Sequence, residues 1–338
     1  MTKADSAESS SMNSPLTPPS LSPEQKSQES LAPGAPLSAQ TPRSPVEKSF
    51  PEYIFQGPEG LRLGWRILVY IGAFGAVLYA LLWLGRSFFL ETISGVGRLW
   101  QEMYGEAALF ISALASAFLM GNIEGSTVDD YGLPRRQVFG KLFWIGALWG
   151  LGSIAVLLVA LRVVCVFDFG HIALHGARIW RFALFWGVFF LLVGLFEEFL
   201  FRGYLLFTLT RSVGFWPAAG ILSCAFGAVH LSNGGEGYVG ALSAAFIGLF
   251  FCLTLQRTGT LWFAVGFHAV WDWGQTYVVG VADSGTVEPG HLLAPSFHGS
   301  PWLTGGSVGP EGSVLCFLLV LVIWMVFAWR YPLAKYQG

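Results

Sequence analysis

The chain has 338 residues, of which 54% are hydrophobic and only 12% are charged, and its formal net charge at pH 7 is −2. Soluble domains carry about 25% charged residues, so this composition excludes an ordinary soluble protein, and the lack of a basic surplus argues against nucleic acid as a partner. The sequence predicts an all-α, polytopic membrane protein that sits in the lipid bilayer.

A polar segment precedes the apolar part of the chain. Residues 1–50 contain 12 Ser and 8 Pro, and Phe50 is their only aromatic residue. A segment of this composition cannot bury enough apolar surface to offset the entropy lost on ordering. We therefore predict a disordered tail over residues 1–58, followed by a transmembrane helical domain over residues 59–338.

Eight apolar stretches follow the tail, and each is a candidate membrane span. They are Trp65–Gly85, Ala107–Gly121, Leu142–Val166, Phe182–Thr210, Trp216–Leu231, Tyr238–Leu255, Thr260–Val281 and Ser313–Trp329. Helix backbones approach closely where small residues recur at spacing four, and two spans have this pattern: Gly146 and Gly150, then Gly240, Ala244 and Gly248.

The basic residues favour one orientation in the membrane. Lys and Arg are enriched in cytoplasmic loops, and the long loop 282–312 contains neither. With eight spans, a cytoplasmic N-terminus returns the C-terminus to the same side and places this loop outside. We predict that both termini are cytoplasmic.

Three spans carry ionisable side chains well inside apolar sequence. A charged group at the centre of a membrane helix costs about 2.5–3.5 kcal/mol on insertion scales, so such groups indicate a structural or chemical use. They are Glu197, Glu198 and Arg202 in the fourth span, His230 in the fifth, and His268 and Asp272 in the seventh.

Helical spacing sorts these groups into pairs. Glu198 and Arg202 are at i, i+4 and can form an ion pair. His268 and Asp272 have the same spacing, so Asp272 can hold one ring nitrogen and set the tautomer. Glu197 is turned ~100° away from Glu198 and has no local partner.

The depths of these groups in the membrane are compatible. Glu197 and His230 each lie 16 residues from the tight turn between the fourth and fifth spans, or ~24 Å along an unbroken helix. By the same arithmetic, His268 and Asp272 lie ~14 and ~20 Å past the turn before the seventh span, a difference that a modest tilt removes. The sequence therefore predicts one polar cluster inside the bundle.

Three motifs in chain order resemble those of the CPBP intramembrane proteases, a family that includes the type 2 CAAX prenyl proteases and bacteriocin-processing or self-immunity proteins. The motifs are Glu197-Glu198-x-x-x-Arg202, Phe226-x-x-x-His230 and His268-x-x-x-Asp272. The resemblance covers about residues 180–280, and a weaker likeness lies upstream at residues 130–133.

This resemblance implies an intramembrane endopeptidase that hydrolyses peptide bonds with glutamate-activated water and no cofactor or metal. It implies that Glu197 is the general base and that His230 helps to position the water. His268 and Asp272 would stabilise the oxyanion or orient the groups that do so. Glu198, Arg202 and Phe226 would support the site.

Asp272 departs from the family pattern, since many members have Asn at the matching position. Asn can donate a hydrogen bond to an oxyanion, whereas an ionised Asp cannot. Either Asp272 orients His268, which is then the main donor, or Asp272 is protonated and donates itself.

Two other classes of protein fit some of these residues. Glu197, His230, His268 and Asp272 form a possible zinc ligand set, although no HExxH motif is present. Acidic and histidine residues in the membrane also mark proton or ion pathways, so an ion-coupled transporter, or an immunity or scaffold protein without catalysis, is the non-enzymatic alternative.

Asp168, His171 and His175 have ligand-like spacing in the loop after the third span, where we predict a solvated turn.

The family name suggests prenylated CAAX peptides as substrates, among other peptide or protein substrates at the membrane. The abundance of the family in bacteria, and a tail without sorting signals, favour a bacterial inner membrane.

Overall fold

The structure is a computed structural model that describes residues 55–57, 60–87 and 97–336. The predicted disordered tail lies outside these ranges apart from residues 55–57. There, β1 (Gln56–Gly57) pairs in antiparallel fashion with β2 (Gly60–Leu61). The division at residue 58 therefore stays a prediction.

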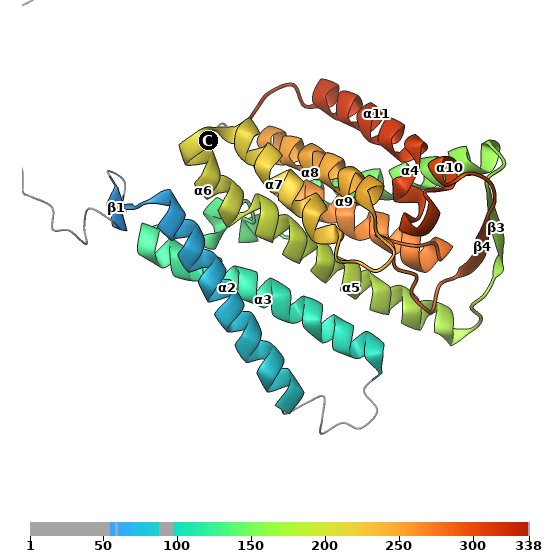
Figure 1. Cartoon of the computed structure of the whole chain (residues 1–338), viewed down its shortest axis with the longest axis horizontal. Helices are drawn as coiled ribbons and strands as arrows, with labels where there is room; N and C mark the ends of the chain where they lie inside the picture. Colours follow the sequence, from blue (N-terminus) through green and yellow to red (C-terminus); the bar gives the residue numbers. More distant parts are fainter. Residues whose placement is uncertain (1–54, 58–59, 88–96, 337–338) are drawn as a thin grey trace, which may run out of the picture. The chain divides into compact units, whose positions relative to one another are not determined.

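Helices dominate the described part of the chain, as Figure 1 shows. The long ones are α2 (Leu63–Gly85), α3 (Arg98–Glu124), α4 (Lys141–Val163), α5 (Ala177–Arg202), α6 (Tyr204–Val213), α7 (Phe215–His230), α8 (Tyr238–Thr258), α9 (Trp262–Trp273) and α11 (Val314–Arg330). Shorter turns are η3 (Val128–Tyr131), η4 (Arg135–Gln137), η5 (Gly274–Val279), α10 (Pro301–Thr304), η6 (Gly306–Val308) and η7 (Pro310–Gly312). The all-α fold class is confirmed.

The helices are those of an integral membrane protein. Within the described ranges, five segments are long and apolar enough to cross a bilayer, namely α2, α3, α4, α8 and the span Ala177–Val213, which comprises α5 and α6. The apolar helices α7 and α11 are shorter. Large apolar side chains such as Tyr79 and Leu148 are exposed on α2 and α4, as expected of helices that face lipid.

All eight predicted spans are helical, but three differ from their predicted form. The second begins at Arg98 rather than Ala107, because Glu102 and Glu106 continue the helix and line an internal cavity instead of facing lipid. The seventh ends at Trp273 and continues as the π-helical turn η5.

The fourth predicted span is broken at Gly203, between α5 and α6. A Cβ atom on Gly203 would lie 2.3 Å from the carbonyl oxygen of Phe199. The chain therefore needs glycine at this position, and the assumption of an unbroken helix between Glu197 and the following turn was wrong.

Helix α9 is surrounded by other helices. It packs on α4, α5 and α8, while α7 packs on α8 and α5. Helices α2 and α3 pack together, and α3 lies along α5 (Figure 1). An antiparallel ribbon of β3 (Phe167–Ile172) and β4 (Leu293–Phe297) joins the chain after α4 to the segment before α10.

The packing of α9 on α4 depends on glycine. A Cβ atom on Gly146 would lie 2.0 Å from the carbonyl oxygen of Phe263, and one on Gly150 would lie 2.3 Å from that of Phe267. The approach is reciprocal, since a Cβ atom on Gly266 would lie 2.1 Å from the carbonyl oxygen of Phe143. The predicted close approach at Gly146 and Gly150 is thus confirmed.

Replacing Gly146 by alanine is expected to lower the free energy of unfolding by about 1–3 kcal/mol, because the added methyl overlaps a neighbouring backbone. Gly152, on the same helix, has no atom within 4 Å of its Cβ position. Gly152→Ala should leave stability unchanged or raise it slightly. Thermal unfolding in detergent measures both, and equal midpoints would contradict the packing argument.

Candidate active site

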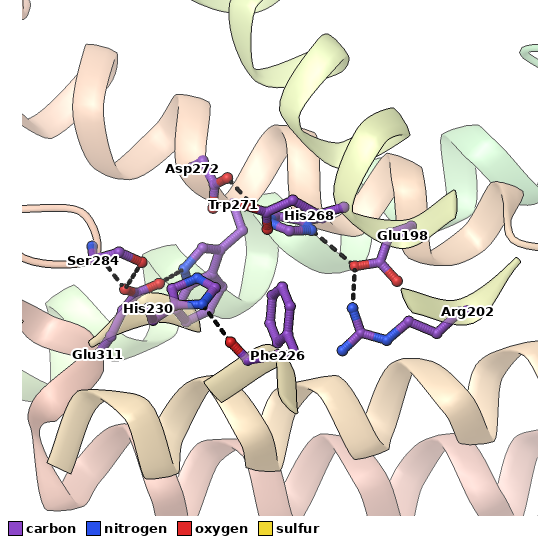
Figure 2. Close-up of polar contacts among 10 residues, drawn as sticks. Glu198, Arg202, Phe226, His230, His268, Trp271, Asp272, Ser284 and Glu311 are labelled. Carbon is purple, nitrogen blue, oxygen red and sulfur yellow. Dashed lines mark hydrogen bonds and ion pairs between the residues drawn. The ribbon is translucent and has the colours of Figure 1, made fainter. Parts of the chain in front are cut away.

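The predicted polar residues come from three helices that meet inside the bundle. Helix α5 carries Glu197, Glu198 and Arg202 near its C-terminal end, and α7 ends at His230. Helix α9 carries His268 and Asp272 on one face, one turn apart. Figure 2 shows that most of these side chains point toward one another.

His268 lies among three carboxylates. Its Nδ1 atom is 2.9 Å from Glu198 Oε1, and its Nε2 atom is 3.3 Å from Asp272 Oδ2 and 3.6 Å from Glu197 Oε2. Both ring nitrogens can donate to carboxylates only in the protonated ring. The arrangement therefore favours a positively charged His268 that two helices hold in place.

The contact between His268 and Glu198 does not follow from the sequence, where i, i+4 spacing gives Glu198 only Arg202 as a partner. Glu198 Oε1 faces both groups, since Arg202 Nη1 is 3.3 Å away. No sequence signal gives this contact, because it depends on how α5 crosses α9. Glu198 thus links the ion pair on α5 to the ring on α9.

The Glu198–Arg202 pair is fully buried, with 0% exposure of both side chains. The guanidinium carbon of Arg202 lies 4.2 Å from the centre of the Phe226 ring, close enough for a cation–π interaction. Gly248 makes room for this group, since a Cβ atom there would lie 2.1 Å from Arg202 Nη2. Phe226 therefore helps to hold the buried charge.

His230 is oriented by its own helix. Its Nδ1 atom is 2.8 Å from the carbonyl oxygen of Phe226, and a carbonyl only accepts, so Nδ1 carries the hydrogen. In the neutral ring Nε2 is then free to accept a hydrogen bond. Among the described residues, no hydrogen bond or ion pair joins His230 to Glu197, although both line the same cavity.

That cavity has a volume of about 300 Å³. Glu197, Phe226, His230, His268 and Asp272 line it, whereas Glu198 and Arg202 lie behind its wall. Among the described residues, its lining has no Lys or Arg, and it includes carboxylates that the sequence motifs do not contain: Glu102, Glu106, Glu236, Asp283, Glu288 and Glu311. The apolar part of the wall includes Phe189, Phe190, Val193, Ile247 and Phe251.

Little in the sequence marked these additional carboxylates. Glu106 directly precedes a predicted span and was excluded from it by its charge. Asp283 and Glu311 belong to the long polar loop, for which the resemblance offered no counterpart. Only the fold brings this loop back to α9.

Three carboxylates gather beside His268. Oxygen atoms of Asp272, Asp283 and Glu311 lie within 4.8 Å of one another, close enough to hold one metal ion. In the described part of the chain this is the only such group, and it contains only Asp272 of the four residues considered for zinc. The geometry therefore does not support the zinc set read from the sequence.

Burial changes the acidity of the loop carboxylates. It raises the pKa of Asp283 well above the usual range, and the charges of Asp272 and Glu311 add to this effect. Burial likewise raises the pKa of Glu311, with Asp272 as the next cause. Burial and the charge of Glu311 together raise the pKa of Glu236 to about 7. Of these three groups, Glu236 can therefore take up a proton in the neutral pH range.

The other ligand-like group lies elsewhere. Asp168 and His171 belong to strand β3 rather than to the predicted turn. Asp168 forms ion pairs with Arg162 at 3.3 Å and with His298 at 3.6 Å. These half-exposed partners face the Asp168 carboxylate at the surface, so its position is explained without a metal ion or ligand.

The family model for type II CAAX prenyl endopeptidases, Rce1-like, matches residues 179–274. This range contains all three motifs, and the match confirms the resemblance that they predicted. It points to a protease of the CAAX type that works within the membrane. No curated protein matches the chain. The matched range ends before Asp283 and Glu311.

Proposed function

We propose that this chain is an intramembrane endopeptidase that hydrolyses peptide bonds with water activated by Glu197. The observation that carries the proposal is that Glu197, His230, His268 and Asp272 line one cavity within the membrane domain. All four belong to the range that matches the Rce1-like family.

In the proposed mechanism, Glu197 removes a proton from a water molecule in the cavity while His230 Nε2 accepts a hydrogen bond from that water. The resulting hydroxide attacks the carbonyl carbon of the scissile bond. When the C–N bond breaks, Glu197 returns the proton to the leaving amine. The water has then been added across the peptide bond, Glu197 is again a carboxylate, and no cofactor is required.

His268 would stabilise the negative charge that develops on the carbonyl oxygen. Its Nε2–H points to the region between Glu197 and Asp272, where a donor can act on a nearby oxyanion. Asp272 faces the same nitrogen at 3.3 Å, so we assign it to a hydrogen bond that orients the Nε2–H and that this hydrogen would share with the oxyanion. Glu198 holds the other nitrogen.

We further propose that the substrate is a membrane-associated peptide or protein, with prenylated C-terminal peptides as the first class to test. The aromatic wall formed by Phe189, Phe190 and Phe251 supports an apolar or lipid-modified segment. A bacterial inner membrane with both termini cytoplasmic remains part of this proposal.

Purified protein incubated with a prenylated C-terminal peptide, and separately with a mixed peptide library, tests the function. Cleavage by the parent and none by Glu197→Gln supports it, and the library defines the preferred sequence. Equal cleavage by both would refute glutamate catalysis. Proton-coupled transport without any cleavage would favour the non-enzymatic alternative.

Chelation distinguishes this mechanism from a metal-dependent one. EDTA is expected to leave kcat unchanged, because every proposed step uses protein groups and water. The measurement is cleavage of the same peptide before and after dialysis against EDTA. Loss of activity that zinc restores would place the metalloprotease alternative first.

A further inference from the structure

The long loop between η5 and α11 is attached to the end of α9 by side chains. Gln275 Nε2 donates to the carbonyl oxygen of Ala282 at 2.7 Å, and Thr276 Oγ1 donates to Asp283 Oδ2 at 2.9 Å. Trp271 Nε1 donates to Glu311 Oε1 at 2.9 Å. The loop therefore contacts the chain on both sides of Asp272.

Glu311 contacts the side chain of Trp271, the residue directly before Asp272. Its second oxygen, Oε2, accepts from the backbone nitrogen of Ser284 at 3.1 Å and faces the Ser284 hydroxyl at 3.3 Å (Figure 2). A carboxylate suits this position because it only accepts hydrogen bonds and offers two oxygens to several donors. Glu311 thus joins the loop directly to the Trp271 side chain.

The regular α-helix of α9 ends at Trp273, one residue after Asp272, and the π-helical turn η5 follows. The π-helix pairs backbone groups five residues apart rather than four, so the side-chain spacing of α9 does not continue past Trp273. The direction of the Asp272 side chain therefore depends on what holds this end of α9. The indole of Trp271 is 7% exposed and stacks on Phe267. The glycine contacts with α4 lie earlier in α9, at residues 263–267, so an anchor on this indole acts on the last turn of the helix and on the direction in which Asp272 points.

We propose that Glu311, although outside the matched range, is a positioning residue of the catalytic centre that acts through Trp271 on the Asp272–His268 pair. The inference rests on the proposed function. Misplacement of a catalytic group by about 1 Å can cost ~10²-fold in rate, so loss of this anchor should act on turnover more than on substrate binding.

The test compares kcat and KM of the full-length protein with those of Glu311→Gln, Trp271→Phe and the double variant. Each single change is expected to lower kcat per folded molecule by ~10–100-fold, with KM within about twofold of the parent. Because both changes break one contact, the double variant should be no slower than the slower single variant.

Asp168→Asn is the matched control, since it neutralises an acidic group on β3 with its own surface partners, and it should retain the parental kcat. Parental kcat in folded Glu311→Gln would overturn the inference, as would additive losses in the double variant. Failure of the proposed function itself looks different, because Glu197→Gln would then cleave as fast as the parent.

Discussion

Replacing Glu197 by glutamine is expected to lower kcat by at least ~10²–10⁴-fold, the usual contribution of a general base. Glutamine has nearly the same shape but cannot take the proton from water. The Glu197 side chain is 22% exposed to the cavity and contacts His268 at 3.6 Å, so the fold should lose little. His230→Ala should cause a comparable loss, because it removes the second group proposed to hold the water.

Thermal unfolding and kcat should be measured on the same preparations. Midpoints close to that of the parent, together with lost cleavage, separate chemistry from folding. Asp168→Asn, which removes a carboxylate outside the cavity, is again the control. If both Glu197→Gln and His230→Ala unfold in detergent, the polar cluster is structural, and the proposed role of Glu197 is wrong.

Removing the charge of Glu198 alone should have the largest effect on stability. Breaking a buried ion pair by removing one partner costs about 3–5 kcal/mol, and Glu198 and Arg202 are both 0% exposed. In Glu198→Gln, the guanidinium would keep the Phe226 ring as its nearest favourable contact. The midpoint of unfolding in detergent should fall accordingly.

The double variant Glu198→Gln with Arg202→Met is the control for this interpretation. It removes both charges but keeps an acceptor for His268 Nδ1. Replacing a buried pair by neutral groups of similar volume is often close to neutral, so the double variant should be more stable than Glu198→Gln. Equal stability would show that the cost comes from packing rather than from an unpaired charge.

The sequence predicted what depends on a single helix. The pairs Glu198–Arg202 and His268–Asp272 follow from i, i+4 spacing, and both are present. The helical fold and the family resemblance followed from apolar length and from motif order. Such features need no knowledge of how the helices cross.

Contacts between helices and loops could not be predicted in the same way. The approach of Glu198 to His268 depends on the crossing of α5 and α9, and the break at Gly203 interrupts the helix that the depth arithmetic assumed to be unbroken. Glu106 was missed because hydropathy treats a charged residue as the edge of a span, whereas in the fold it lines the cavity. Glu311 lies 40 residues from Trp271, and loop folding alone joins them.

The glycine contacts between α4 and α9 have a consequence for how a peptide reaches the cavity. At Gly146, Gly150 and Gly266 an added Cβ atom would overlap the backbone of the facing helix, so movement of this part of α9 against α4 is restricted.

The contact between α3 and the loop that contains Glu288 is of a different kind. There, Arg98 at the start of α3 bridges Glu102 and Glu288 through a side chain that is 61% exposed, and an exposed ion pair of this kind contributes little to stability. Under the proposed function, we therefore expect substrate to enter by movement of α3 and the loop around Glu288 rather than of α9.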